Sequence, residues 1–168
     1  MVQIYTGTGK GKTTASLGLI CRALGNNFKV CLIQFMKKNA DYSEIKFLSK
    51  QDNLDIFQFG TSSFVNPEKP AEIDLEEAEK AYKKAKEILE SGKYDLVVID
   101  EINVAVSWKL LPLEKQLELM EIKGRAEIVM TGRYAEAEVV KRAHLVTEML
   151  EIKHYYTLGK DARKGIEY

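Results

Sequence analysis

A glycine-rich stretch near the start of the chain, TGTGKGKTT at residues 6–14, has the composition of a phosphate-binding loop. Its glycines allow successive backbone N–H groups to point at one anion, and Lys12 adds a positive charge. Thr13 carries a hydroxyl that can ligate Mg²⁺. The common P-loop pattern is G-x-x-x-x-G-K-[ST], and Thr6 stands where its first glycine is expected. We expect phosphate contacts from Gly7, Thr8, Gly9, Lys10, Gly11, Lys12, Thr13 and Thr14.

A second motif, LVVIDE at residues 96–101, is an apolar run that ends in two acids. An apolar strand followed by acids is typical of a Walker B element, in which a carboxylate lies near the metal ion. Acids also occur at the solvated ends of ordinary strands, so the motif alone does not settle the matter. Combined with the glycine-rich stretch, Asp100 and Glu101 indicate a metal site beside the phosphates.

Short apolar runs rich in β-branched residues alternate with helical patterns along the chain and predict the strands of one sheet. These runs cover residues 2–6, 30–35, 54–59, 96–99 and 128–131, with 145–149 as a sixth candidate. Several are almost continuously apolar, which is typical of parallel strands covered on both faces by helices. The sequence therefore predicts an α/β, doubly wound, mostly parallel sheet of about six strands, with its ligand site at the carboxyl ends of the strands.

Helices are predicted over residues 12–25, 42–50, 71–91, 103–108 and 135–143, with another after Pro112. We expect Gly25 to end the first helix as a left-handed glycine, and Gly92 to close the third. In the third helix, apolar residues at helical spacing predict one buried stripe. Its members are Ile73, Ala78, Ala81, Ala85 and Leu89.

The composition limits the possible functions. A chain of 168 residues fits one domain, and 25 basic against 25 acidic side chains give no net charge. Duplex nucleic acid and anionic membranes are therefore not expected as partners. Cys21 and Cys31 have apolar neighbours and are expected to be buried thiols, which suits a reducing cytoplasm. No apolar run approaches the ~20 residues of a membrane-spanning helix.

These motifs predict a nucleotide site without choosing the reaction, because P-loop proteins include kinases, motors and switches. A kinase for a nucleoside or small molecule and a non-catalytic nucleotide-binding module both stay open on the residues alone. Arg133 directly follows the predicted strand at 128–131, which would place it at the mouth of the site. It could bind ATP, or it could cap a helix or form a salt bridge.

Further short motifs make the sequence similar to the P-loop family of ATP:corrinoid adenosyltransferases, which produce adenosylcobalamin in its synthesis or salvage. The resemblance covers nearly the whole chain, residues 1–168, as a single domain with a P-loop NTPase-like (RecA-like) fold. The compact glycine spacing of residues 7–13 is also that family's pattern. The motifs are YTGTGKGKTT at 5–14, RALG at 22–25, QFMK at 34–37, IDEI at 99–102, TGR at 131–133, VTEM at 146–149, KH at 153–154 and GIEY at 165–168.

The resemblance implies that a reduced Co(I) corrinoid attacks C5′ of the ATP ribose and that triphosphate leaves. The loop would then hold the leaving group, with Lys12 stabilising its growing charge. Mg²⁺ or Mn²⁺ would be held by Thr13 and Glu101, with Asp100 as an additional or indirect ligand. Lys12 and Glu101 are thus the expected catalytic residues.

At the rim of the site, the resemblance implies lower-ranked contacts with nucleotide or corrinoid from Gln34, Lys37, Asn103 and Arg133. Phe64 would crowd the lower face of the corrin ring, or would belong to the core. Trp108 is expected to be a packing residue. His144 is expected to be structural, and His154 is not expected to ligate cobalt, because the family keeps that face of the metal unligated.

The resemblance also implies a homodimer and a flavodoxin-like reductant. Many members carry a segment before the first strand that covers the site, whereas here the first strand is predicted to begin at Val2. Cover is then expected from a partner subunit or from the loop at 37–43, or is reduced.

Overall fold

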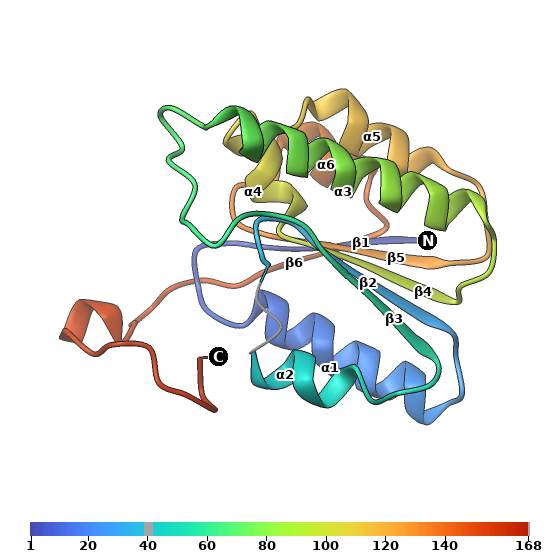
Figure 1. Ribbon diagram of the computed structural model, residues 1–168, viewed down its shortest axis with the longest axis horizontal. Coiled ribbons are helices and arrows are strands. Elements are labelled where there is room, and N and C mark those ends of the chain that lie inside the picture. Colours follow the sequence, from blue (N-terminus) through green and yellow to red (C-terminus); the bar gives the residue numbers. More distant parts are fainter. Residues whose placement is uncertain (39–41, 168) are drawn as a thin grey trace.

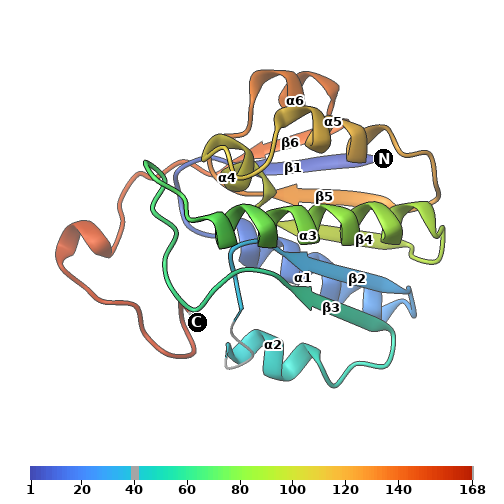
Figure 2. The same ribbon diagram turned by 45° about the horizontal axis from the view of Figure 1, so that its top comes forward.

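The computed structural model describes residues 1–38 and 42–167 and contains one six-stranded sheet between two layers of helices (Figure 1). All its strand pairs are parallel, and their order across the sheet is β3-β2-β4-β5-β1-β6, as Figure 2 shows. The predicted α/β, P-loop NTPase-like architecture is confirmed, and the sheet is parallel throughout its described pairs.

Every predicted strand is present, within one residue of its expected bounds at either end. The strands are β1 (Val2–Thr6), β2 (Val30–Gln34), β3 (Leu54–Gln58), β4 (Leu96–Asp100), β5 (Glu127–Thr131) and β6 (Leu145–Glu148). All residues of β2 and β4 are buried, because helices cover both faces of these strands. At the edge of the sheet, β6 is exposed along its whole length.

Helices α1 (Lys12–Gly25) and α2 (Ser43–Leu48) cover one face of the sheet. The opposite face carries α3 (Glu72–Glu90), α4 (Ile102–Ser107), α5 (Leu113–Glu121) and α6 (Ala137–Arg142). Each face of the sheet therefore has its own apolar core. One core includes Ile33, Ala81, Ile99 and Leu119, and the other includes Ile20, Leu32 and Val98.

Three local predictions were wrong. Ile73 is 45% exposed, because it lies in the first turn of α3 away from the buried stripe that Ala78, Ala81 and Leu89 form. Gly25 ends α1 as a helical residue, and the left-handed residue beyond it is Asn27, with φ 57°. Cys21 is exposed on α1, whereas Cys31 in β2 is buried as expected.

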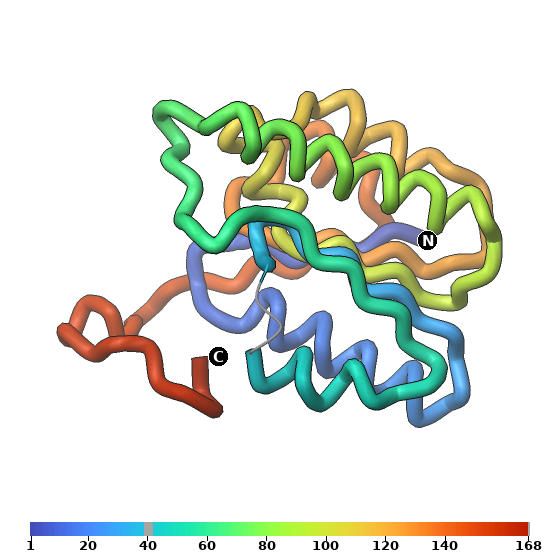
Figure 3. The backbone as a smooth tube through the Cα atoms, in the orientation of Figure 1, coloured from blue at the N-terminus to red at the C-terminus, as the bar shows by residue number. Residues whose placement is uncertain are grey.

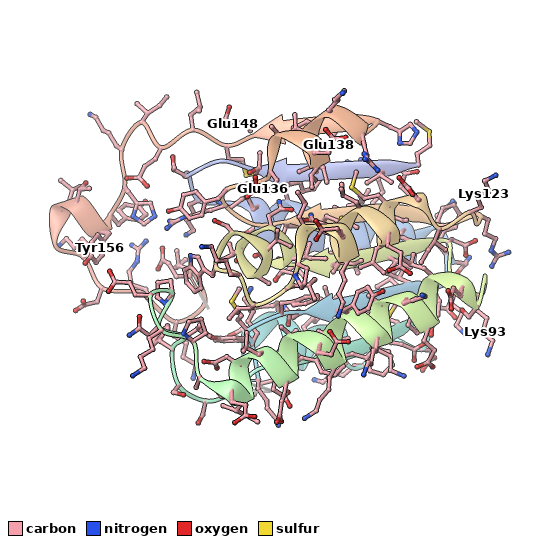
Figure 4. The ribbon with its side chains drawn as sticks, turned by 90° about the horizontal axis from the view of Figure 1, so that it is seen from above. Lys93, Lys123, Glu136, Glu138, Glu148 and Tyr156 are labelled. Atoms are coloured by element: carbon pink, nitrogen blue, oxygen red, sulfur yellow. The ribbon has the colours of Figure 1, made fainter. Side chains whose placement is uncertain are left out.

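A tail follows β6, and its described part, from Met149 to Glu167, runs out beyond the sheet before it turns back (Figure 3). A short 3₁₀ helix, η1 (Tyr156–Leu158), marks its far end and was not predicted. Figure 4 shows Tyr156 at the opposite end of the molecule from Lys93 and Lys123. Among the described residues, no helix combines the length and apolarity that crossing a membrane requires.

The strands all end on a polar residue at one edge of the sheet. These residues are Thr6, Gln34, Gln58, Asp100, Thr131 and Glu148. In the paired register, Gln34 lies beside both Gln58 and Asp100. Because parallel strands bring their carboxyl ends together, the fold gathers these polar groups where the glycine-rich loop also begins.

Candidate nucleotide site

A cavity of about 800 Å³ opens at the carboxyl edge of the sheet. Its walls come from the segments that follow the first five strands: the glycine-rich loop, then residues 35–38, 61–65, 101 and 133. A volume of this size is typical of a small-molecule site. The predicted location of the ligand site is therefore where the structure has its large cavity.

The glycine-rich loop joins β1 to α1, as predicted, and residues 9–14 line the cavity. Gly7 has φ 94° and Gly11 has φ 118°, conformations that L side chains rarely adopt. Gly9 must lack a side chain for a different reason, because a Cβ there would lie 2.7 Å from the carbonyl oxygen of Leu150. Thr8 is exposed and, like Gly7, is not among the cavity-lining residues.

Lys12 is buried at the first position of α1, and its ammonium points back into the loop. It donates hydrogen bonds of 2.7 Å to the carbonyl oxygens of Gly7 and Gly9. Burial lowers the pKa of Lys12 from its ordinary value, and the positive charge of Arg133 adds to this effect. Lys12 thus keeps the loop curved around the place where an anion would lie.

Asp100 is fully buried and is the centre of a polar network. Its Oδ1 accepts hydrogen bonds from Thr13 Oγ1 at 2.9 Å and Thr131 Oγ1 at 2.6 Å. Its Oδ2 accepts from Gln34 Nε2 at 3.0 Å and Lys37 Nζ at 2.7 Å. Burial alone would raise the pKa of Asp100, but the Lys37 ammonium and these donors outweigh it and hold the pKa below its ordinary value. The carboxylate is therefore ionised and orients Thr13.

Glu101 is the residue after β4 and lines the cavity from a left-handed conformation, φ 65°. Its backbone N–H donates to Thr131 Oγ1 at 3.1 Å, which holds the strained turn in place. Burial, followed by the neighbouring charge of Asp100, raises the pKa of Glu101. The turn directs Glu101 into the cavity, whereas Asp100 stays beneath its floor.

The donor set at this point suits a hard divalent cation. Hydroxyl and carboxylate oxygens lie beside the glycine-rich loop, from Thr13, Asp100 and Glu101. Mg²⁺ is commonly bound by one or two carboxylates together with substrate phosphates. Within the described residues, no three His, Cys, Asp or Glu side chains form a metal cage of their own. These residues therefore fit a metal ion that is shared with a phosphate ligand.

Two residues expected at the rim are buried instead. Gln34 is fully buried and supports Asp100, while its Oε1 accepts a hydrogen bond from Gln58 Nε2 at 2.9 Å. Asn103 is 1% exposed and donates to the Gly132 carbonyl at 3.1 Å. Both side chains hydrogen-bond to residues beside the cavity, and neither is among the residues that line it.

Sequence reasoning missed three polar residues of this region: Gln58, Thr131 and Gln116. Gln58 and Thr131 are the last residues of β3 and β5, and a polar residue at the carboxyl end of a strand could have indicated that they lie near the site. Gln116 lies inside α5 and donates to Asn103 Oδ1 at 2.8 Å. The pair Asn103 and Gln116 therefore fixes the carbonyl that precedes Arg133.

Replacing Asn103 with leucine should destabilise the protein by about 1–3 kcal/mol, because the Gly132 carbonyl and the Gln116 amide lose their partner while buried. Urea unfolding measures this loss. The double variant N103L/Q116L removes both polar partners and should lose less than the sum of the two single changes. A fully additive double variant would contradict this coupling.

Three of the residues predicted at the rim do line the cavity: Lys37, Phe64 and Arg133. Phe64 has a fully exposed side chain, so its alternative as a core residue was wrong. Trp108 packs against the main core, as predicted for it, and also lines the cavity. Arg133 is exposed and, within the described residues, is held by no ion pair. The predicted salt-bridging alternative for Arg133 is therefore not what the described residues show.

The two histidines differ in role. His144 Nδ1 accepts a hydrogen bond from the backbone N–H of Val2 at 3.0 Å, so its predicted structural role is confirmed. His154 lines the cavity, and its Nδ1 accepts from the N–H of Tyr156 at 3.1 Å. The loop at 37–43, suggested as a cover, includes residues 39–41, which lie outside the described residues, as does Tyr168 of the last motif.

The tail returns to the glycine-rich loop at two points. The N–H of Gly9 donates to the Met149 carbonyl at 2.7 Å, and Lys10 Nζ contacts Glu167 Oε1 at 2.9 Å. Arg163 binds the same carboxylate, and both contacts hold the pKa of Glu167 low, at about 2. The tail thereby forms one side of the cavity, to which Glu167 also contributes.

Comparison with known proteins extends these observations. Residues 1–168 match the family described as "ATP:corrinoid adenosyltransferase BtuR/CobO/CobP". A corrinoid adenosyltransferase of Pseudomonas aeruginosa is 32% identical over 166 residues, which are 98% of this chain and 82% of that protein. One from a Sinorhizobium species is 32% identical, over 100% of this chain and 80% of its own length. One from Escherichia coli (strain K12) is 31% identical, over 100% and 85%.

Proposed function

The chain belongs to the family of ATP:corrinoid adenosyltransferases, and from this premise we propose how its cavity carries out the reaction. The enzyme transfers the 5′-deoxyadenosyl group of ATP to the cobalt of a reduced corrinoid. The observation that carries the proposal is that the glycine-rich loop and the aromatic side chains of Phe64 and Trp108 line the same cavity. One end of such a cavity suits a polyphosphate and the other suits a flat apolar ring system.

In the proposed reaction, the Co(I) centre attacks C5′ of ATP and a Co–C bond forms. The C5′–O bond breaks, its electron pair leaves with the triphosphate, and cobalt is formally oxidised to Co(III). Negative charge grows on the departing oxygen, where Lys12 and the N–H groups of the loop would stabilise it. The attacking and leaving groups need no proton transfer, so no side chain has to act as a general base.

We propose that Thr13 and Glu101 hold Mg²⁺ or Mn²⁺, with Asp100 orienting Thr13 through their 2.9 Å hydrogen bond. When bound, such an ion would neutralise charge on the triphosphate. Arg133 would bind a phosphate, since it lines the same cavity as Lys12. Phe64 and Trp108 would contact the corrin ring, because large aromatic surfaces at a cavity mouth bind flat ligands well.

Substituting Glu101 with glutamine should raise the Mg²⁺ concentration needed for half-maximal ATP binding by about tenfold, because one anionic ligand is lost. Titration calorimetry of ATP binding at several Mg²⁺ concentrations measures this change. Glu136, labelled in Figure 4, is exposed and lies outside the cavity lining, so Glu136→Gln is the matched control. Equal Mg²⁺ requirements in both variants would contradict the assignment of Glu101.

The kinase and non-catalytic alternatives are not favoured, since the relatives are corrinoid adenosyltransferases. The reaction is tested by incubating the protein without oxygen in the presence of Mg-ATP and a chemically reduced corrinoid. We expect free triphosphate together with a light-sensitive Co–C product. ADP together with a phosphorylated acceptor would instead identify a kinase, and ATP binding without product would identify a binding module.

We further propose a cytoplasmic homodimer that receives electrons from a flavodoxin-like reductant. The exposed edge strand β6 and the apolar side chains beyond it support a second copy as partner. The exposed apolar residues of this region are Leu145, Val146, Leu150, Ile152, Tyr155, Tyr156, Leu158 and Ile166. Light scattering after size exclusion should give twice the mass of one chain, and a monomer at all concentrations would contradict the dimer.

A further inference from the structure

The side chain of Lys37 places a positive charge beside both Thr13 and Asp100. Lys37 Nζ lies 2.7 Å from Asp100 Oδ2 and 3.5 Å from Thr13 Oγ1. The Thr13 hydroxyl donates its hydrogen bond to Asp100, so the lone pairs of the Thr13 oxygen are free to contact a cation. The Lys37 ammonium therefore contacts two of the three residues whose oxygens would suit a metal ion.

The backbone holds Lys37 in this position. The preceding residue, Met36, is left-handed, with φ 54°, and the N–H of Lys37 donates to the Phe59 carbonyl at 2.9 Å. Gly60 passes so close that a Cβ there would lie 2.9 Å from the Lys37 nitrogen. The turn after β2 is thus built to direct Lys37 over Asp100, and it does so at the cost of a strained residue.

Burial and charge show what this ammonium does. The Asp100 side chain is 0% exposed and that of Lys37 is 22% exposed, so Lys37 separates the carboxylate from the cavity. With no ligand bound, the two acids Asp100 and Glu101 face three cationic side chains, and their charge is already neutralised. The three cations are Lys12, Lys37 and Arg133. A divalent ion arriving alone would leave excess positive charge in a poorly solvated site. A metal–nucleotide complex is anionic, so its arrival would not leave excess positive charge in the site.

We propose that Lys37 is the resident cation of this site: it excludes free divalent metal and leaves Asp100 only when metal arrives with the triphosphate. The released ammonium then contacts a phosphate, since Lys37 lines the cavity that would hold it. This inference rests on the proposed binding of Mg²⁺ or Mn²⁺ at Thr13 and Glu101. In this role Lys37 makes the site bind the metal–nucleotide complex in preference to free metal. That role differs from the phosphate binding proposed for Lys12 and Arg133.

The test uses Mn²⁺ alone, without nucleotide, on the whole protein, and measures free Mn²⁺ by electron paramagnetic resonance. Lys37→Met should bind Mn²⁺ at least about tenfold more tightly than the wild type, because the competing charge is gone. Mn²⁺ should likewise raise the melting temperature of this variant more than that of the wild type. Lys37→Gln can still donate to Asp100 and should show the same gain even where Lys37→Met folds poorly.

Two further variants separate charge from position. Lys37→Arg keeps a cation beside Asp100 and should exclude free Mn²⁺ as the wild type does. Lys93→Met removes an exposed charge outside the cavity lining, at the far end of the molecule, and should also bind Mn²⁺ as the wild type does. If neither neutral variant at position 37 gains affinity for Mn²⁺, the proposal is overturned.

A parallel titration of wild-type protein with Mn²⁺ and ATP distinguishes this failure from a failure of the metal site itself. If ATP brings Mn²⁺ to the wild type but Lys37→Met and Lys37→Gln gain nothing without ATP, only the role of Lys37 is wrong. If ATP brings no Mn²⁺ to the protein, the metal site at Thr13 and Glu101 is wrong, and the role of Lys37 falls with it.

Discussion

Lys12→Met is expected to lower adenosyl transfer by about 10²–10³-fold or more, while the fold is retained. The wild-type ammonium is buried between the loop carbonyls of Gly7 and Gly9, both of which accept its hydrogen bonds. In the proposed reaction this charge stabilises the departing triphosphate, so its loss should reduce kcat more than it raises the KM for ATP. Single-turnover formation of the Co–C product gives the rate directly.

The matched control for this variant is Lys93→Met, which removes the same charge at the far end of the molecule (Figure 4). Its side chain is exposed, and activity should stay within a factor of about two of wild type. Lys10→Met gives a graded comparison, because Lys10 pairs with Glu167 at 2.9 Å and is only in part available to phosphate. If Lys10→Met reduced kcat as much as Lys12→Met, a special role of Lys12 in leaving-group stabilisation would be refuted.

The second large effect is expected for Gly7→Ala, which should destabilise the protein by about 2–5 kcal/mol. A Cβ at Gly7 would lie 2.7 Å from the backbone nitrogen of Met149, and its contact with the Met149 carbonyl would be closer still. The φ of 94° adds strain for any L side chain. In a chain of 168 residues this loss corresponds to a fall in melting temperature of roughly 5–15 °C.

Gly18→Ala is the control for this prediction, because Gly18 is exposed on α1. A methyl group on its Cα would have no described atom within 4 Å beyond the backbone of its own helix. Alanine in a helix interior should stabilise the protein by about 0.5–1 kcal/mol. Differential scanning calorimetry measures both variants. A Gly7→Ala protein that melts with the wild type would show that the loop and the segment after β6 are not in tight contact.

The sequence was sufficient for the elements and for the edge of the sheet that carries the site. Continuous apolar runs mark β2 and β4, and the polar residues at strand ends mark where chemistry is possible. Thr13 and Asp100 are 87 positions apart, yet two familiar motifs were enough to predict that they meet. The prediction succeeded because both motifs come with a fixed structural context.

The sequence was insufficient for side chains whose direction depends on a neighbouring strand. Gln34 was predicted to face a ligand, but the pairing of β2 with β4 places it beside Asp100 and under the cavity floor. Asn103 follows the same acids that mark the site, yet α4 turns it toward Gln116. Strand order and helix rotation are products of the whole fold, so no local pattern could have revealed these contacts.

The position of β1 in the sheet affects how the protein folds during its synthesis on the ribosome. β1 is made first, but both of its partners, β5 and β6, are made last, and Val2 pairs with Ile128. At about 5–20 residues per second, this strand must wait for several seconds or longer before any neighbour exists. Gly9 and Lys10 wait longer still, for Met149 and Glu167. A nascent chain should therefore gain affinity for ATP only after the segment from β5 to Glu167 has been made, which makes nucleotide binding a late event of its folding.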